Sequence, residues 1–370
     1  MTHRYYLMQA HFQKSKPATC TVLPVSETAT SLFAHSLPKI LALVNEKFTI
    51  ETTYLKHTIS SDQICLVKDT QRNFGELLLA LYEFHLYENL LDEFFWYISV
   101  LTSRGFQRSY FEQMIRTWTI AIHSVVKPPE SHELVRPLQW LTGHLSLLYE
   151  QRALAEECRA QELAPFLELL LKKKRKEAAE YVLSCSTQGV SLEKLYAEVL
   201  TLSLREIGRL WQKNTISVVD VHVATDICRY IMMRLADSVT PEAALPYTAL
   251  VTCVPGEEHE TASEIVENYL ETKGWQILSM GHIAPEGDII RALEAHTPDV
   301  VFLSVTLCIN LPSAKALALK IRHAAPQVKI VIGGRAAGCA REVLMHFADA
   351  IVESIGETHI HALTLVSSHA

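Results

Sequence analysis

The sequence predicts an α + α/β protein with an all-helical N-terminal domain, a helical bundle and a C-terminal, doubly wound parallel sheet. Two observations predict this fold class. Through residues 31–238, apolar residues recur at spacings of three and four, which is typical of packed amphipathic helices. Beyond the proline-containing linker DSVTPEAALP, short apolar strands alternate with helical segments, which indicates a parallel sheet covered on both faces.

The first helical domain is expected over residues 31–155. Segments such as FEQMIRTWTIAIHSVV place their apolar residues on one helix face, and the prolines of KPPES (127–131) separate two helices. Residues 1–30 are expected to form a loop or extended arm, because the Pro-, Ser- and Thr-rich stretch KSKPATCTVLPVSETATS has no sustained helical period.

A second helical unit is expected over residues 160–238, as a bundle of three or four helices joined by short turns. Ser217, followed three residues later by Asp220, is expected to cap the beginning of the last helix. The basic run KKKRK at 172–176 lies inside a helical segment among glutamates, so we interpret it as a solvated face and not as a nucleic-acid patch.

The α/β domain is expected over residues 246–370. The strands YTALVTCV, WQILSM, VVFLSV, KIVIGG and DAIVES alternate with amphipathic helices. Short parallel strands of this kind favour a flavodoxin-like sheet with strand order 2-1-3-4-5, in which ligands bind at the carboxyl ends of the strands.

Composition excludes several classes of protein. The 370 residues include 34 Lys and Arg against 41 Asp and Glu, a net charge of −7 that disfavours nonspecific binding to nucleic acid or acidic membranes. The eight cysteines lie more than 20 positions apart, which excludes a local zinc site and a dense disulfide framework. We therefore expect a reduced, cytoplasmic protein without a membrane span.

Unusual residues follow three of the predicted strands. They converge at one edge of the sheet, because strands 1, 3 and 4 are neighbours in the expected order. No GxGxxG motif follows the first strand, so a dinucleotide site is disfavoured. The residues are Pro255, Gly256, Glu257, Glu258 and His259 after the first strand, Ser304, Val305 and Thr306 after the third, and Gly333 and Gly334 after the fourth.

Glu257 and His259 form a pair that suits metal ligation. A carboxylate can accept the hydrogen of one ring nitrogen, which fixes the tautomer and makes the other nitrogen a better donor to a metal. An isolated pair of this kind is more often a surface histidine beside an acid. Its position after a buried strand favours the interpretation of this pair as a metal site.

In this context PGEEHETA, LSVT and IGG resemble the cobalamin-binding domain of methionine synthase, corrinoid methyl carriers and light-sensing transcriptional regulators. The resemblance implies that His259 displaces the benzimidazole base and becomes the lower axial ligand of cobalt, with Glu257 as its partner. It also implies that Ser304, Thr306, Gly333 and Gly334 flank the nucleotide tail. Ala262 stands where that family usually has glycine, and its methyl group is expected to narrow the tail channel without abolishing binding.

The segment LYAEVLTLSLREIGRLWQKNTISVVDVHVATDICRYI resembles the helical cap that covers the upper face of the cofactor in that family. The light-sensing branch has a Trp, nine residues, then Glu and His. Here Trp211 is followed by nine residues and then by Val221 and His222, so the Glu is missing. The resemblance implies that Trp211 packs against the upper ligand and that His222 is a second axial ligand once light has removed an adenosyl group.

The resemblance as a whole implies a photoreceptor that is not an enzyme and acts like the antirepressor group, because no winged helix-turn-helix domain is evident in the first 150 residues. It implies adenosylcobalamin in the dark and hydroxocobalamin or a bis-histidine form after light. The expected partner is a transcription regulator or a second copy of the chain, without direct contact to nucleic acid.

Two alternatives stay open. One is a corrinoid methyl carrier of a methyltransferase system. The other is an N-terminal domain that is an enzyme, or a haem or bilin binder. His85, His123 and His144 are the histidines it would use, but their spacing selects no metal.

Overall fold

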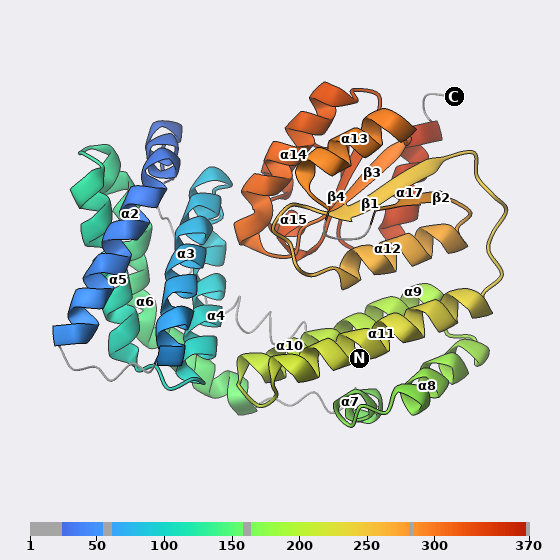
Figure 1. Cartoon of the computed structure of the whole chain (residues 1–370), viewed down its shortest axis with the longest axis horizontal. Coiled ribbons are helices and arrows are strands. Elements are labelled where there is room, and N and C mark those ends of the chain that lie inside the picture. The colour runs from blue at the N-terminus through green and yellow to red at the C-terminus, as the bar shows by residue number, and fades with distance from the viewer. Residues whose placement is uncertain (1–23, 55–60, 158–163, 281–283, 368–370) are drawn as a thin grey trace. The chain divides into compact units, whose positions relative to one another are not determined.

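The computed structural model describes residues 24–54, 61–157, 164–280 and 284–367. The chain divides into two compact units, residues 1–162 and residues 163–370 (Figure 1). The first is helical, and the second combines a helical bundle with a five-stranded parallel sheet. The predicted α + α/β class is confirmed.

The first unit is built from long helices that pack on one another. Helix α2 begins at Glu27, so the last four residues of the expected arm are helical, while residues 1–23 lie outside the described part of the chain. As the prolines at 128 and 129 predict, one helix ends at Val125 and the next begins at Glu130. The helices are α2 (Glu27–Tyr54), α3 (Ser61–Glu83), α4 (Leu90–Thr102), α5 (Arg108–Val125) and α6 (Glu130–Glu157), with the short 3₁₀ turn η1 (Tyr87–Asn89).

Aromatic side chains fill the core of this unit, and one buried amide connects them. The indole of Trp118 donates to Oε1 of Gln71 at 2.6 Å, and Nε2 of Gln71 donates to the hydroxyl of Tyr110 at 3.3 Å. Because a buried polar group is costly when unpaired, this network fixes how α3 packs against α5. Gly75, one turn after Gln71, gives the Trp118 ring its space.

Replacing Gly75 with alanine is expected to destabilise the first unit. A Cβ atom there would lie 2.6 Å from Cη2 of Trp118 and 2.9 Å from Cδ1 of Leu37. Trp118 is fully buried, so the overlap outweighs the gain in helix propensity, and we expect a net loss of roughly 1–3 kcal/mol. Chemical denaturation measures this. Gly143→Ala in α6 is the matched control, since nothing lies within 4 Å of its Cβ position; an equal effect of both variants would contradict the argument.

The bundle of the second unit begins with α7 (Ala164–Leu171) and α8 (Arg175–Thr187). One helical segment then runs from α9 (Leu192–Lys194) through the π-helical segment η2 (Leu195–Thr201) into α10 (Leu202–Gln212). Ser217 and Asp220 form a reciprocal capping box at the beginning of α11 (Val218–Ser238), as the sequence predicts. The helices enclose an apolar core that includes Tyr196, Ile207 and Ile231.

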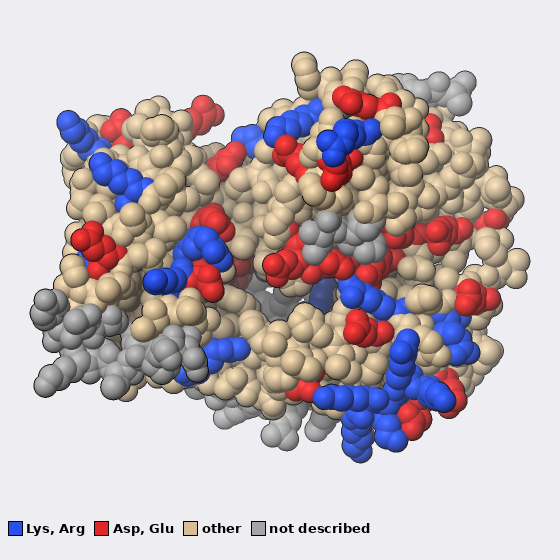
Figure 2. Space-filling model, viewed as in Figure 1, with Lys and Arg blue, Asp and Glu red and all other residues tan. Residues whose placement is uncertain are grey.

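The basic run at 172–176 is exposed, and it pairs with local acids as expected (Figure 2). Lys172 contacts Glu168 at 2.5 Å, and Lys174 contacts Glu177 at 2.9 Å. The run is not inside one helix, because the chain turns between α7 and α8 with Lys173 at φ 58°. The ammonium of Lys173 reaches Asp220 at 3.0 Å, so this turn is tied to the first turn of α11.

The sheet has the predicted order β2-β1-β3-β4-β5, and all its pairs are parallel. Helices α12 and α17 pack on one face, while α13 packs with α14 on the other (Figure 1). The strands are β1 (Thr248–Cys253), β2 (Gln276–Ser279), β3 (Val300–Ser304), β4 (Lys329–Gly333) and β5 (Ala350–Val352). The helices are α12 (Thr261–Thr272), α13 (Glu286–His296), α14 (Leu311–Ala324), α15 (Arg335–Cys339), α16 (Arg341–Leu344) and α17 (Ile355–Ser367), with the 3₁₀ turn η3 (Cys308–Asn310) before α14.

Glu267 on α12 makes stability depend on pH. Burial raises its pKa to about 7; the Ser279 hydroxyl lowers it, and the charges of Glu271 and Glu264 raise it further. A raised pKa in the folded state means that ionised Glu267 destabilises the fold, fully above pH 7 and not at all below about 4.5. Glu267→Gln is therefore expected to stabilise the protein at pH 8 by about 1–2 kcal/mol, discounted for partial exposure, and to have little effect near pH 4.5.

Denaturation of wild type and Glu267→Gln at both pH values measures this difference. Glu294→Gln on the exposed surface of α13 is the control, and we expect it to be neutral at either pH. A Glu267→Gln effect that is the same at pH 4.5 and pH 8 would contradict the assigned pKa.

No described helix is both long enough and apolar enough to span a lipid bilayer.

Candidate functional site

The loop after β1 presents His259 at the carboxyl edge of the sheet. Gly256 opens this loop at φ 87°, a left-handed conformation that favours glycine. The chain then turns so that Glu257 points inward and His259 points outward. The side chain of Glu257 is fully buried, whereas that of His259 is 54% exposed.

One carboxylate oxygen of Glu257 fixes His259. Oε1 accepts from Nδ1 of the His259 ring at 2.6 Å and from the His259 backbone N–H at 3.1 Å. Because an ionised carboxylate only accepts, a neutral His259 carries its proton on Nδ1. Its Nε2 keeps a lone pair, and no described residue hydrogen-bonds that atom. The expected pairing is present, and it leaves one imidazole nitrogen available to a metal.

The other oxygen of Glu257 binds the loop after β3. Oε2 accepts from the backbone N–H groups of Thr306 at 2.7 Å and Leu307 at 3.0 Å, and from Nδ2 of Asn310 at 3.1 Å. Burial alone raises the pKa of Glu257, but the hydrogen bonds from His259, Leu307, Asn310 and Thr306 outweigh it and lower the pKa to about 2. The carboxylate is thus ionised at neutral pH and joins two loops.

The glycines after β4 bring bare backbone to the same edge. Ser304 pairs with Gly333 in the sheet, and Val305 N–H donates to the Gly333 carbonyl at 2.9 Å. Gly334 has φ 106°, and a Cβ there would lie 2.3 Å from the Val305 carbonyl oxygen. At Gly333 a Cβ would lie 3.0 Å from Cγ2 of Val352. A side chain at Gly334 would overlap backbone atoms, and one at Gly333 would press on Val352, so both positions favour glycine and leave bare backbone at this edge.

The remaining predicted tail residues also lie near this edge. Ser304 is buried at the end of β3, and Thr306 follows two residues later with its backbone committed to Glu257. Ala262 is the second residue of α12 and is half-buried. The residues present fit a corrinoid: an exposed imidazole nitrogen for cobalt, a buried acid that orients the imidazole, and a glycine edge beside it.

The residues predicted to cover the upper face of the cofactor belong to the bundle. Trp211 lies in the last turn of α10 and is half-buried, and Val221 packs against the bundle core. His222 is exposed, and Val218 and Val219 on the same first turns of α11 are 53% and 59% exposed. The side chains of Val218, Val219 and His222 thus form an exposed apolar and imidazole surface at this end of the bundle. Among the described residues, no hydrogen bond joins His222 to the His259 loop.

Sequence reasoning missed several residues of the site. Asn310, at the N-cap position of α14, supplies a donor to Glu257, and its type before Leu-Pro was the available signal. Leu307 contributes only its backbone, which leaves no mark in the sequence. Arg229 on α11 bonds to Glu260 and Glu264 beside His259, a contact between two domains that local patterns do not reveal.

Other candidate sites receive no support from the described residues. None of their His, Cys, Asp and Glu side chains form a group of three or more that could hold a metal ion. His123 contacts the hydroxyl of Ser131 at 3.2 Å, and His144 contacts the Trp140 carbonyl at 2.8 Å.

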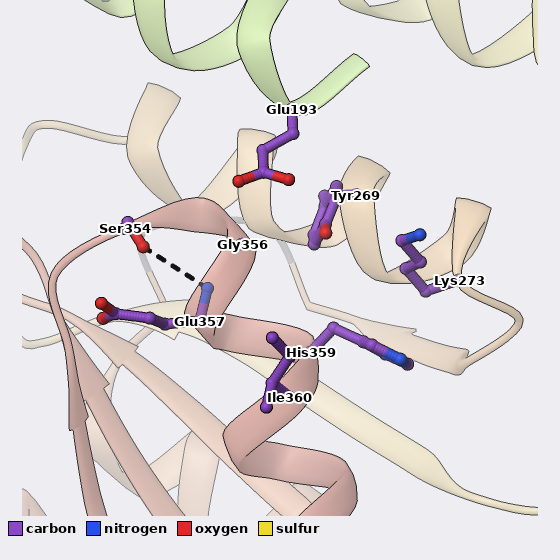
Figure 3. Close-up of a pocket in the computed structure, with 8 residues that line it drawn as sticks. All are labelled: Glu193, Tyr269, Lys273, Ser354, Gly356, Glu357, His359 and Ile360. Atoms are coloured by element: carbon purple, nitrogen blue, oxygen red, sulfur yellow. Dashed lines mark hydrogen bonds between the residues drawn. The ribbon is translucent and has the colours of Figure 1, made fainter. Parts of the chain in front are cut away.

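A separate pocket of about 390 Å³ lies between α9, α12 and the beginning of α17, with Glu193 pointing at Gly356 (Figure 3). It contains none of the predicted site residues.

Two family models match this chain. Residues 247–363 match the B12 binding domain, and residues 163–236 match a second model that is also described as a B12 binding domain.

Curated relatives include two repressors from Myxococcus xanthus. The HTH-type transcriptional repressor CarH is 26% identical over 145 residues, 39% of this chain and 48% of CarH. The HTH-type transcriptional repressor CarA is 30% identical over 133 residues, 35% of this chain and 43% of CarA. The chain therefore spans less than half the length of each repressor.

Corrinoid proteins are also similar to the chain. Dimethylamine corrinoid protein 3 of Methanosarcina acetivorans is 23% identical over 173 residues, 43% of this chain and 81% of that protein. The solved monomethylamine corrinoid protein of Methanosarcina barkeri has a TM-score of 0.46 and 15% identity, covering 54% of this chain and 96% of its own. The helical bundle and the α/β domain of this chain thus each match a B12 binding domain model.

Proposed function

We propose that this protein is a cobalamin-binding light sensor that regulates a partner protein or its own assembly. The observation that carries the proposal is the Glu257–His259 pair, which offers one oriented imidazole nitrogen at the carboxyl edge of the sheet. The bundle adds Trp211 and the exposed His222, in the same order along the chain as in light-sensing relatives of this domain.

Each residue has a defined part in this proposal. His259 would hold cobalt through Nε2, and Glu257 orients its ring and keeps the proton on Nδ1. Ser304, Thr306, Ala262, Gly333 and Gly334 line the space of the nucleotide tail. When bound, adenosylcobalamin supplies a cobalt–carbon bond that light can break. Trp211 and Val221 would cover the other side of the cofactor, and His222 would be the residue that holds cobalt in a bis-histidine form after illumination, while hydroxocobalamin would be the form in which His222 does not bind.

The output follows from a change in the bundle. Ligand exchange shifts a conformational equilibrium only by its difference in binding free energy between two states, so the bundle must contact the dark and lit cofactor differently. The chain acts in the cytoplasm through a transcription regulator or a second copy, without contacting nucleic acid and without catalysis.

Absorption spectroscopy tests the proposal. Purified protein is mixed with adenosylcobalamin, and spectra are recorded before and after green light for wild type, His259→Ala and His222→Ala, with His296→Ala as control. We expect wild type and His296→Ala to form a stable photoproduct. His222→Ala should bind cofactor but lose that photoproduct, and His259→Ala should bind weakly. Identical spectra for all four proteins would refute both axial assignments.

A corrinoid methyl carrier is the second candidate, favoured by the match that spans 81% of a dimethylamine corrinoid protein. It requires a cobalt that is reduced and remethylated by a partner, without photochemistry. A wild-type spectrum that green light leaves unchanged, together with methylation of the reduced protein by a methyl donor, would favour this candidate.

A further inference from the structure

Arg229 joins the bundle to the loop that carries His259. From α11 its Nε donates to Oε1 of Glu264 at 2.6 Å, and its Nη2 donates to Oε2 of Glu260 at 2.7 Å. One guanidinium thus bridges two carboxylates, an arrangement for which its planar fork of donors is suited. The side chains of Arg229, Glu260 and Glu264 are 35%, 27% and 12% exposed, so the contact is partly withdrawn from water.

Glu260 connects this contact to the candidate cobalt ligand. It follows His259 directly and occupies the N-cap position of α12. Its carbonyl accepts from the Ser263 hydroxyl at 2.7 Å and from the Ser263 backbone at 2.9 Å, which fixes the backbone on the far side of His259. The His259 loop is therefore held from two directions, by Glu257 on the sheet side and by Arg229 on the bundle side.

Apolar contacts attach the bundle to α12 beyond the ionic contact. Ile265 and Tyr269 of α12 are buried in the same cluster as Ile231 and Leu235 of α11. Arg229 lies just before these residues along α11. The first part of α11, with His222, extends past the beginning of α12 (Figure 1). Arg229 thus binds the first turn of α12, and buried residues on either side of it along α11, such as Ile227 and Ile231, belong to the same apolar cluster.

We propose that Arg229 is a positioning residue that couples the orientation of the His259 loop to the position of the first half of α11. This inference rests on the proposed cobalamin site. The contact links the two elements: a displacement of the first half of α11 pulls on Glu260, and a change at His259 is transmitted to the part of α11 that carries His222. In the described part of the chain, Arg229 hydrogen-bonds to neither the His259 imidazole nor the His222 imidazole, so it acts through the backbone of residues 259 and 260.

Hydrogen–deuterium exchange of the cofactor-free, full-length chain tests the coupling directly. Arg229→Gln is expected to increase deuterium uptake in two separate segments, residues 218–228 and residues 257–264. Arg234→Gln is the matched control, because Arg234 lies on the same helix but, among the residues that the structure describes, contacts only the Tyr230 hydroxyl at 2.9 Å and the Tyr230 ring. Arg229→Lys should give an intermediate result, since an ammonium cannot bridge both carboxylates in the same geometry.

Cobalamin binding supplies a second readout. Titration with hydroxocobalamin is expected to show roughly tenfold weaker binding for Arg229→Gln, the lower end of the losses seen when groups behind a metal ligand are altered. Arg234→Gln should bind as wild type does. If Arg229→Gln is poorly folded, Glu260→Gln provides the same test from the other side of the contact.

The two proposals fail in different ways. Unchanged uptake at 257–264 in Arg229→Gln, or equal uptake in the Arg234→Gln control, overturns the coupling whatever the cofactor does. A wild-type chain that binds no cobalamin overturns the proposed function, while the exchange data on the cofactor-free chain still report on Arg229.

Discussion

Glu257→Gln is expected to weaken cobalamin binding by about 10–100-fold, the usual cost of removing the group that orients a metal-bound histidine. The carboxylate accepts five hydrogen bonds, two on Oε1 and three on Oε2. An amide has one accepting oxygen and one donating nitrogen, so in either orientation its NH₂ group faces donors. Each buried donor left unpaired costs about 1–3 kcal/mol, so the free energy of unfolding should fall as well.

The orientation of the substituted amide decides which of these hydrogen bonds are lost, and so whether cobalamin binding is lost beyond the loss of stability. If its oxygen stays with Thr306, Leu307 and Asn310, its nitrogen faces Nδ1 of His259, which must then lose its proton to accept. The free proton moves to Nε2, and the nitrogen that would bind cobalt is blocked. The loss of cobalamin affinity should therefore exceed what the loss of stability explains.

Cobalamin titration and denaturation of the same preparations measure both effects. Glu258→Gln is the matched control, because it makes the same change at the adjacent, exposed position. We expect it to leave affinity and stability close to those of wild type. Wild-type affinity in a folded Glu257→Gln protein would show that His259 does not depend on this carboxylate.

Periodicity predicted the sheet because parallel strands and their helices are encoded locally. Each strand is a continuous apolar run, and each helix carries its own amphipathic face, so the order of elements along the chain was sufficient to choose the topology. The turn within KKKRK was missed because lysine and arginine suit helices, and only the conformation of Lys173 interrupts them.

The site was predicted only in part, since its chemistry depends on both side chains and backbone. Glu257 and His259 were recognisable from their types and spacing, and Gly333 and Gly334 from their place after a strand. The N–H groups of Thr306 and Leu307 carry no signal of residue type, although they lie as close to the carboxylate as Nδ2 of Asn310 does. Arg229 required knowledge of which helix packs on α12, which is a tertiary fact.

Gly334→Ala is expected to destabilise the second unit by roughly 3–5 kcal/mol, because two penalties add. Gly334 has φ 106°, where a side chain is strained in any environment. Its Cβ would also lie 2.3 Å from the oxygen and 2.8 Å from the carbon of the Val305 carbonyl, and backbone atoms cannot move aside as a flexible side chain can.

Gly338→Ala, four residues later in α15, separates this cause from a general effect of losing a glycine. Its Cβ would approach only the flexible Glu353 side chain, at 3.4 Å, and alanine has the higher helix propensity, so we expect a change between zero and about 1 kcal/mol in the stabilising direction. Denaturation monitored by circular dichroism compares the two variants. Since Val305 precedes the donors to Glu257, Gly334→Ala should also reduce cobalamin binding, whereas Gly338→Ala should not. Equal stability of the two variants would mean that Gly334 does not lie as close to the Val305 carbonyl as the structure places it.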